Sequence, residues 1–196
     1  MPDNDSMRLF IGVPLSMRSL RAVANAASDL KERSASSNAE FRWISPARYH
    51  VTLAYLGWAA PAVVPGIVDA VAKAIEGVKP FEMRCADLGG FPSLDAAKVL
   101  WAGVNDRMGE LEALAKKVSA ACADLGFAEA EREFHPHVTI ARLKGSADLV
   151  KLAQESPAHV FSKSSVESLI LYKTSVESDA SEHEKVAQWS LRPPLE

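Results

Sequence analysis

The chain has 196 residues, with 22 Lys and Arg against 25 Asp and Glu, so its formal net charge is −3 at pH 7. That length suits one domain, and a hydrophobic content of 48% excludes disorder as the main state. The apolar runs fall far short of the ~20 residues that a membrane-spanning helix needs. The mild negative charge disfavours a broad polyanion-binding surface but leaves room for a local basic patch.

The cysteine content and the first residues bear on the compartment. Two cysteines, Cys85 and Cys122, are too few for a disulfide framework or a structural zinc site, and both lie among apolar residues. Residues 1–7 are polar and acidic and lack the basic and apolar regions of a secretory signal. We therefore expect both cysteines in the core and the protein in the cytoplasm.

In chain order, the hydrophobic pattern predicts strands and helices that do not strictly alternate. Apolar or alternating segments predict strands at 9–13, 41–44, 49–56, 81–88, 99–104, 137–143, 166–172 and 185–191. Apolar residues at helical spacing predict helices at 17–30, 64–75 and 108–125, and a short helix is expected at 147–153. Several strands are neighbours along the chain, so we predict an α+β fold with mainly antiparallel sheets. No linker separates parts of the chain, so residues 1–196 are expected to form a single domain.

Some finer predictions concern where elements end. Gly89, Gly90 and Pro92 are expected to break the chain after the strand at 81–88. Asn105 or Asp106 is expected to cap the helix that follows. The buried helix faces are expected to include Met17, Met108 and Leu125, which lie in register with the other apolar residues.

One five-residue pattern occurs twice. His-Val-Thr-Leu-Ala at 50–54 recurs as His-Val-Thr-Ile-Ala at 137–141. Side chains alternate between the two faces of a strand, so in each copy the histidine and the threonine two residues later share one face. If the two strands lie side by side about a pseudo-two-fold axis, two imidazoles and two hydroxyls face one cleft. Neither copy supplies a third metal ligand, so the pattern does not indicate a metal site.

Two histidines and two threonines suit a particular reaction. Near pH 7 one imidazole can be neutral and the other protonated, which gives a general base and a general acid. Two hydroxyls can hold the non-bridging oxygens of a phosphate. The pattern therefore predicts in-line phosphoryl transfer, in which one histidine activates water and the other protonates the leaving oxygen. A cyclic phosphodiester suits this chemistry, because its strained ring needs little electrophilic help from a metal.

The paired H-x-T-x motif resembles that of the 2H phosphoesterase superfamily. More narrowly, it resembles the RNA 2′,3′-cyclic phosphodiesterase branch, also called 2′-5′ RNA ligase or LigT-like. Further matches to this family lie at 8–15, 42–43, 88–92, 99–104 and 134–143. The resemblance implies a bilobal 2H phosphoesterase fold, in which two mainly antiparallel sheets with flanking helices are related by a pseudo-two-fold axis. It also implies hydrolysis of a 2′,3′-cyclic phosphate, on an RNA 3′ end or a nucleoside, to a 2′-phosphate without metal or cofactor.

The same resemblance implies roles for particular residues. By match to the motif positions, His50 and His137 are catalytic, and Thr52 and Thr139 bind phosphate. The match also implies that Arg142 contacts the phosphate, and it favours His137 as the base and His50 as the acid. Strict alternation, however, puts Arg142 on the opposite face from His137. Arg142 therefore reaches the cleft only through a bulge, a strand end or its own length.

Several alternatives stay open from the residues alone. The chain is a phosphodiesterase as above, a 2H enzyme for another cyclic phosphate or a 2′-5′-linked substrate, or a non-catalytic nucleotide-binding module. Reverse ligation through a 2′-5′ bond follows from microscopic reversibility. The other histidines, His135, His159 and His183, are expected to be loop or surface residues. The protein is expected to be a monomer.

Basic and aromatic residues surround both copies of the motif. The basic residues are either ordinary solvated charges or a rim that draws RNA ends into the cleft: Arg42, Arg48, Arg132, Arg142 and Lys144. The aromatic residues either pack in the core or stack on a terminal base: Tyr49, Tyr55, Trp58 and Phe134. Alternation places Tyr55 on the face opposite His50.

Overall fold

A computed structural model describes residues 6–128, 133–156, 160–174 and 183–191. The strands are β1 (Met7–Pro14), β2 (Glu40–Trp43), β3 (His50–Ala59), β4 (Phe81–Phe91), β5 (Ala97–Asn105), β6 (His137–Ala147), β7 (Val160–Val166), β8 (Ser168–Thr174) and β9 (Glu184–Ser190). The helices are α1 (Met17–Arg33), α2 (Val64–Ala74), α3 (Glu110–Ala123) and α4 (Val150–Gln154). Short 3₁₀ turns lie at Ser34–Ser36, Pro46–Arg48 and Pro61–Val63.

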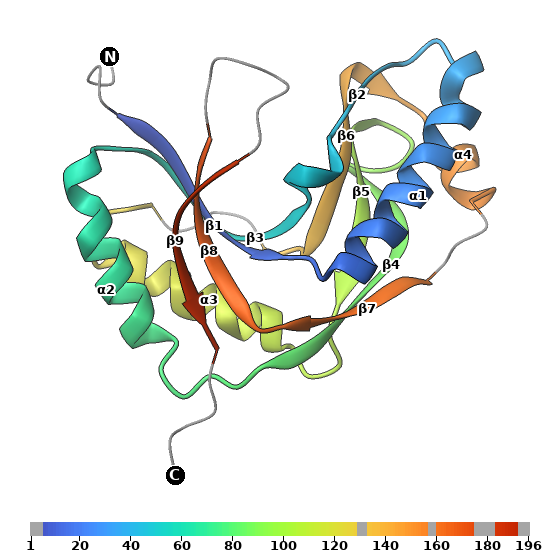
Figure 1. Cartoon of the computed structure of the whole chain (residues 1–196). Helices are drawn as coiled ribbons and strands as arrows, with labels where there is room; N and C mark the ends of the chain where they lie inside the picture. Colours follow the sequence, from blue (N-terminus) through green and yellow to red (C-terminus); the bar gives the residue numbers. More distant parts are fainter. Residues whose placement is uncertain (1–5, 129–132, 157–159, 175–182, 192–196) are drawn as a thin grey trace.

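The strands form two antiparallel sheets. The first has the order β3-β1-β8-β9, and the second has the order β2-β6-β5-β4-β7. We call the first sheet with α2 and α3 the first lobe, and the second sheet with α1 and α4 the second lobe (Figure 1). This arrangement confirms the predicted α+β fold with two mainly antiparallel sheets.

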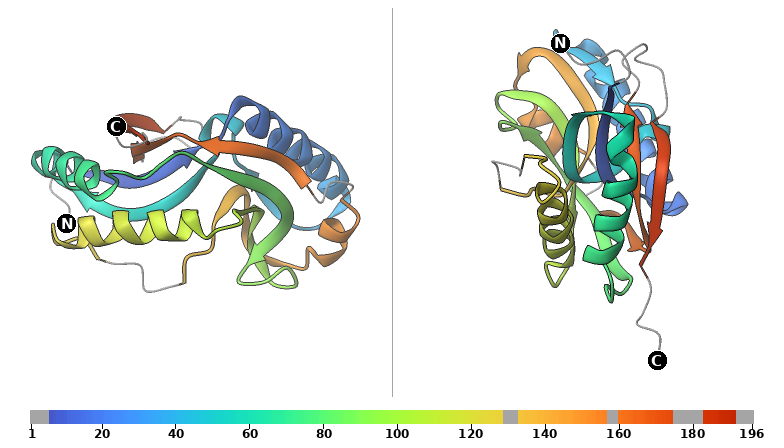
Figure 2. Two further views of the ribbon diagram at one scale, coloured as in Figure 1. Left: turned by 90° about the horizontal axis from the view of Figure 1, so that it is seen from below. Right: turned by 90° about the vertical axis from the view of Figure 1, so that its left-hand side faces the viewer.

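The two helices that follow the central strands cross between the lobes. Helix α1 follows β1 of the first sheet but packs on β7 of the second, and α3 follows β5 of the second sheet but packs on β3 of the first (Figure 2). The start of α1 is tied to β7, because Ser16 N–H donates to Ser164 Oγ at 3.0 Å and Ser19 Oγ donates to the Lys163 carbonyl at 3.1 Å. The lobes are therefore interlocked by their own connections.

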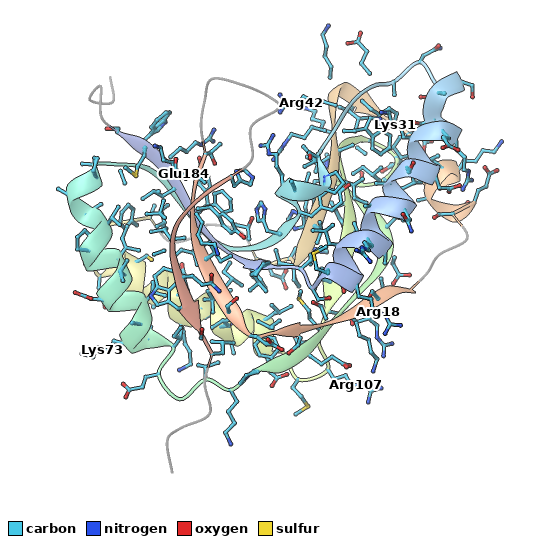
Figure 3. All side chains as sticks on the ribbon, in the orientation of Figure 1. Arg18, Lys31, Arg42, Lys73, Arg107 and Glu184 are labelled. Atoms are coloured by element: carbon cyan, nitrogen blue, oxygen red, sulfur yellow. The ribbon has the colours of Figure 1, made fainter. Side chains whose placement is uncertain are left out.

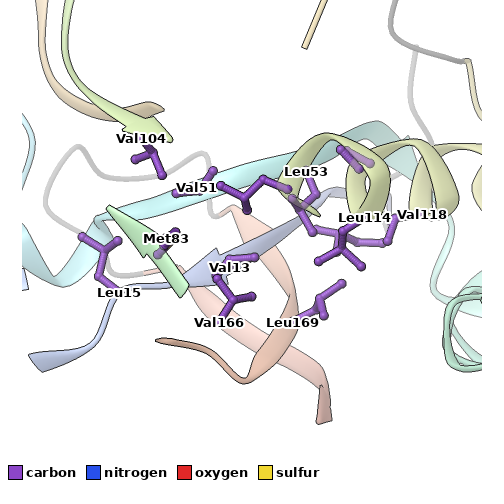
Figure 4. Close-up of a cluster of buried hydrophobic side chains, with 14 of the residues drawn as sticks. Val13, Leu15, Val51, Leu53, Met83, Val104, Leu114, Val118, Val166 and Leu169 are labelled. Carbon is purple, nitrogen blue, oxygen red and sulfur yellow. The ribbon is translucent and has the colours of Figure 1, made fainter. Parts of the chain in front are cut away.

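One apolar core runs through both lobes. Val13 and Val51 of the first sheet belong to the same buried cluster as Met83 and Val104 of the second (Figure 4). Burying this much apolar surface is the main favourable term in folding. Because the core is shared, it also fixes how the two sheets lie relative to one another.

The cysteines lie in this core, as predicted. Cys85 and Cys122 are both buried as free thiols. Burial raises the pKa of each thiol to about 11, since desolvation disfavours the thiolate. Both therefore stay protonated at neutral pH and behave as small apolar side chains.

The predicted break at Gly89 and Gly90 is wrong. Strand β4 continues through both residues to Phe91. A Cβ atom on Gly89 would lie 2.0 Å from a ring carbon of Trp101 on the neighbouring strand. The glycine therefore marks a close approach between strands, where only a residue without a side chain fits.

The ends of the helices also differ from the prediction. Met17, Met108 and Leu125 are 62%, 81% and 44% exposed, because each lies at or beyond a helix end where no neighbouring sheet covers it. Gly109, not Asn105 or Asp106, is the N-cap residue of α3, but the Asp106 carboxylate does accept from the N–H groups of Glu110, at 2.7 Å, and Leu111, at 3.0 Å. Among the described residues, no helix is long and apolar enough to cross a membrane.

Candidate active site

A cleft of about 560 Å³ brings residues of both sheets together. Strand β3 contributes His50 and Thr52, and β6 contributes His137, Thr139 and Arg142. The two strands contact one another directly. All five residues singled out in the sequence therefore line one cleft. The lining is completed by Arg8, Phe10, Arg42, Ile44, Arg48, Tyr55, Thr174 and His183.

A glycine lies opposite each motif on the neighbouring strand. Gly12 of β1 pairs with Thr52, and Gly103 of β5 pairs with His137. A Cβ atom on Gly12 would lie 2.9 Å from the Val51 carbonyl oxygen and 3.2 Å from Cδ2 of His50. The absence of a side chain at Gly12 therefore lets the His50 ring lie against its neighbouring strand.

Backbone carbonyls fix the orientation of both imidazoles. Nδ1 of His50 lies 2.8 Å from the Arg48 carbonyl oxygen, and Nδ1 of His137 lies 2.7 Å from the His135 carbonyl oxygen. A carbonyl oxygen only accepts, so each Nδ1 carries a proton and donates it. In the neutral ring this leaves the unprotonated Nε2 as the atom that can take or give a proton in the cleft.

Each catalytic candidate also lies among other aromatic rings. The His50 ring centroid is 4.6 Å from Phe10, 5.6 Å from Tyr172 and 5.2 Å from His183. Its Nε2 is 3.1 Å from Oγ1 of Thr52. The His50 ring is thus held by packing against its neighbours and by hydrogen bonds at both nitrogens, which is the preorganisation that catalysis needs.

The second histidine has a matching set of ring neighbours. The His137 centroid is 4.9 Å from Phe91 and 6.1 Å from Trp101, and His135 packs on Trp101 at 4.8 Å. His135 is therefore a supporting residue, through its carbonyl and its ring. It is not among the residues that line the cleft.

Both imidazoles are held in the neutral form. Burial is the main reason that the pKa of His50 is lowered to about 4, and the nearby His183, His137 and Arg48 add to it against the opposing Arg48 carbonyl hydrogen bond. Burial also lowers the pKa of His137, with smaller contributions from His135 and Arg142. At neutral pH the free protein therefore has two neutral imidazoles, and a bound anion raises the pKa of each.

A bulge turns Arg142 into the cleft. In the β5–β6 ladder Leu100 lies opposite Ala141, but Trp101 lies opposite Thr139, so Ile140 is an extra residue. The extra residue reverses the alternation after it. Arg142 and His137 therefore reach the same cleft despite their odd separation in the sequence.

The first lobe has the same bulge at the same motif position. Ile11 lies opposite Ala54 and Gly12 opposite Thr52, so Leu53 is the extra residue in β3. Tyr55 consequently lines the cleft, and the prediction that it lies opposite His50 is wrong. A bulge is a pairing irregularity between two strands, so a single strand's pattern does not reveal it.

His183 is the residue that the sequence pattern did not indicate. It lines the cleft and packs on Phe10 at 4.8 Å as well as on His50, so the prediction of a surface position is wrong. Burial lowers its pKa to about 4, and Arg48 adds to this shift. No local pattern around His183 marks it, because its neighbours in the cleft come from strands far away in the sequence.

The remaining residues near the motifs divide into core, surface and cleft. Tyr49 is buried and Phe134 packs on the core, whereas Trp58 is 50% exposed. Lys144 pairs with Glu40 at 3.4 Å and does not line the cleft. The predictions for Arg132 and His159 lie outside the described residues.

Four arginines give the cleft a positive potential. Arg8, Arg42, Arg48 and Arg142 line it, and the lining residues that the structure describes include no Asp or Glu. Burial lowers the pKa of Arg142, and the positive charges of Arg42, Arg48 and Arg8 add to this. This concentration supports the basic-rim interpretation for Arg42, Arg48 and Arg142. Within the described part of the chain, no group of three or more His, Cys, Asp and Glu could hold a metal ion.

Comparison with known proteins agrees with this geometry. The sequence model of a family described as the 2′-5′ RNA ligase superfamily matches residues 21–176, which contain both motifs. The chain is 34% identical to an RNA 2′,3′-cyclic phosphodiesterase of Geobacillus stearothermophilus, over 93% of this chain and 56% of that protein. It is 32% identical to a protein of the same name from Aeropyrum pernix, over 64% of this chain and 72% of that one.

The fold has a close counterpart among solved structures. The crystal structure of the protein TT0787 from Thermus thermophilus superposes with a TM-score of 0.78 at 23% identity, covering 95% of this chain and 99% of that one. The chain spans little more than half the length of the Geobacillus relative, at 56%.

Proposed function

This chain belongs to the 2′-5′ RNA ligase superfamily, and on that premise we propose that it hydrolyses RNA-terminal or nucleoside 2′,3′-cyclic phosphates to 2′-phosphates. The observation that carries the proposal is the pair of imidazoles that line one cleft from opposite lobes, each with Nδ1 hydrogen-bonded to a backbone carbonyl. Nε2 of His50 also lies 3.1 Å from Oγ1 of Thr52. The names of the two relatives, both RNA 2′,3′-cyclic phosphodiesterases, support the proposal.

The phosphate is held by neutral and charged donors. The hydroxyls of Thr52 and Thr139 donate to non-bridging oxygens, and the Arg142 guanidinium donates to the same group with its fixed pair of N–H bonds. Negative charge grows on those oxygens as water adds to phosphorus. Donors that are already oriented toward them lower the barrier, because they need no rearrangement during the reaction.

In the chemical step one histidine takes a proton from water and the other gives a proton to the leaving oxygen. Nε2 of His137 removes a proton from water while the water oxygen bonds to phosphorus, and Nε2 of His50 gives a proton to the ribose 3′ oxygen as the bond from phosphorus to that oxygen breaks. The products are a 2′-phosphate and a free 3′-hydroxyl. The two histidines have then exchanged protonation states, and solvent resets them. The choice of His137 as base follows the family resemblance.

The depressed pKa values fit this sequence of events. With a pKa lowered to about 4, His50 is a strong acid once protonated. The phosphodiester anion favours protonation when it binds beside the ring. Charge stabilisation in the step comes from Arg142 and the protonated imidazole, so we expect activity without a metal ion.

The test is ³¹P NMR of the purified protein in EDTA, with a 2′,3′-cyclic nucleotide and with a short RNA that ends in the same group. We expect conversion to a 2′-phosphomonoester. His50→Asn and His137→Asn are each expected to lower kcat by about 10³-fold, in the range for loss of a general acid or base. Thermal melting of both variants checks that they fold.

Each other outcome contradicts part of the proposal. Full activity in either variant rules out the two-histidine mechanism, and activity lost in EDTA rules out metal independence. A 3′-phosphate product reverses which ring oxygen leaves. Binding without turnover of either substrate favours the nucleotide-binding module.

A further inference from the structure

Two arginines of the cleft have no role in the reaction as proposed. Arg8 comes from β1 of the first lobe and Arg42 from β2 of the second, and both line the cleft. Arg42 lies opposite Arg142 in the β2–β6 ladder. The Arg8 guanidinium lies 5.1 Å from the Tyr55 ring centroid, and its Nε donates to the Tyr55 hydroxyl. The two arginines are thus held by different lobes.

Both arginines lie farther along the cleft than the histidines. Arg42 lies opposite Arg142, which follows His137 by five residues, and Arg8 lies opposite Trp58, which follows His50 by eight residues. At about 3.3 Å per residue this separates the backbones by about 16 Å in the second lobe and by about 26 Å in the first, somewhat less across the bulges. Figure 3 labels Arg42 at the end of β2, on the side of the molecule away from Arg18 in α1.

The electrostatic neighbours give the same placement. The charges that act on Arg142 are those of Arg42, Arg48 and Arg8. The charges that act on His50 are those of His183, His137 and Arg48 instead. Arg8 and Arg42 therefore act on Arg142 and not on His50, whereas Arg48 acts on both.

Arg8, Arg42 and Arg142 together have more positive charge than the reacting group requires. A 2′,3′-cyclic phosphate has one negative charge, which Arg142 alone can offset. Two further guanidinium groups line the same cleft, in a chain whose net charge is −3. Guanidinium groups gathered in this way suit the bidentate binding of a second phosphate.

We propose that Arg8 and Arg42 form an outer anion subsite for the phosphate on the 5′ side of the terminal nucleotide. The inference rests on the proposed function: the cyclic phosphate lies at the histidines, and the same nucleotide extends outward to its 5′ phosphate. An RNA end, which always has that phosphate, is then a better substrate than a free nucleoside cyclic phosphate, which has none.

An exposed aromatic residue beside Arg8 supports an RNA chain as the occupant. Trp58 lies directly opposite Arg8 in the β1–β3 ladder, so the two side chains share a face of the sheet. Trp58 and the nearby Tyr55 are 50% and 51% exposed. Aromatic rings interleaved with cations are how proteins commonly hold single-stranded RNA, by stacking bases and tracking the backbone.

The minimal test compares two substrates that differ by one phosphate. Uridine 2′,3′-cyclic phosphate and its 5′-phosphorylated form are hydrolysed by wild type, Arg8→Gln, Arg42→Gln and the control Arg18→Gln, which removes an equal charge from α1. We expect wild type and the control to prefer the 5′-phosphorylated substrate by about tenfold or more in kcat/KM. Each cleft variant is expected to lose most of that preference while its kcat/KM for the unphosphorylated substrate falls about threefold at most.

Salt dependence gives a second readout. The logarithm of kcat/KM should fall more steeply with the logarithm of salt concentration for the 5′-phosphorylated substrate, because an additional phosphate contact is screened. In Arg8→Gln and Arg42→Gln the two slopes should converge. Both substrates carry the same reacting group, so the difference in slope belongs to the outer subsite.

The outcomes separate this inference from the function on which it rests. If wild type turns over both substrates equally, or the cleft variants weaken both equally, the subsite is overturned and the phosphodiesterase stands. If Arg18→Gln also removes the preference, the preference comes from the overall charge of the protein, and the subsite is overturned. If wild type turns over neither these substrates nor a short RNA with the same end, both proposals fail.

Discussion

His50 and His137 have matching surroundings that are built from different residues. Each ring donates from Nδ1 to the carbonyl two residues before it, and each lies against a phenylalanine and a second histidine. Each strand then bulges at the same motif position. After the bulge, however, the first lobe presents Tyr55 and the second presents Arg142.

This difference shows what the repeat preserves within the chain and what it does not. The backbone geometry that aims an imidazole is present twice, because it depends on strand pairing and a carbonyl position. A positive charge is present once at this position, because Tyr55 stands where the other lobe has Arg142. At this position the cleft is therefore alike in backbone geometry in the two lobes and polarised in charge.

Removing the charge of Arg142, which has no counterpart at Tyr55 in the first lobe, tests this difference most strongly. Arg142→Gln is expected to lower kcat/KM for a 2′,3′-cyclic nucleotide by about 10²-fold, the usual effect of losing one strong donor to the transition state. Tyr55→Phe at the equivalent position should lower it no more than about threefold, since a single neutral hydroxyl is lost. Steady-state kinetics measures both, and equal losses would contradict a polarised cleft.

The pH dependence tests the feature that the two histidines share. Both pKa values are lowered, that of His50 to about 4. The reaction needs one protonated imidazole, and above its pKa that form becomes tenfold rarer with each pH unit. In free enzyme, kcat/KM should therefore fall about tenfold per unit above about pH 6.5, after a maximum at lower pH. A plateau between neutral and mildly alkaline pH would contradict the lowered values.

Substitutions of Gly12 and Gly103, the glycines opposite the two motifs, test how the position of His50 and the stability of the second sheet depend on close packing. Gly12→Ala puts a methyl group 2.9 Å from the Val51 carbonyl oxygen and 3.2 Å from the His50 ring, so we expect a lower free energy of unfolding and a kcat about fivefold lower as the ring is displaced. Gly103→Ala brings its methyl group 2.7 Å from the Ala86 carbonyl, so it should mainly lower the free energy of unfolding, by about 1–3 kcal/mol. Urea unfolding and kcat are measured on both. A larger loss of kcat in Gly103→Ala would contradict this assignment.

The smallest expected effect concerns the second histidine in each aromatic cluster. His183 lowers the pKa of His50, and the two rings contact at 5.2 Å. His183→Phe keeps an aromatic ring at this place and removes the charge that His183 carries when protonated, so the pKa of His50 should rise. His135→Phe, which changes the cluster around His137, is the matched control. Histidine NMR titrations measure both, and no shift in His183→Phe would contradict the coupling.

Much of this site is predictable from strand alternation and one repeated pattern. The alternation rule puts His50 and Thr52 on one face because the bulge begins only after the threonine. The same rule fails for Tyr55 and Arg142, because an extra residue between two strands depends on their pairing. The family resemblance, unlike alternation, does indicate Arg142.

The other errors have the same physical origin. Glycine is typical of turns, but Gly89 lies within a strand. There the ring of Trp101 on the neighbouring strand leaves no room for a side chain. His183 has no periodic neighbours and reaches the cleft through contacts with Phe10 and His50, far away in the sequence. Met108 continues the helical spacing of apolar residues, but no other part of the described molecule covers it, so it is exposed. In each case a contact of long sequence separation decides the outcome.

The crossing helices have a consequence for how the protein is made. β1 lies between β3 and β8, and α1 of the first half packs on β7, so the second sheet is completed only by β7 and the first only by β8 and β9. A nascent chain that has left the ribosome through β6 already has both histidines but lacks these three strands. Domains generally fold as units during synthesis. The two sheets are therefore completed in one late event, and a fragment that stops short of β8 contains both motifs without a complete first sheet.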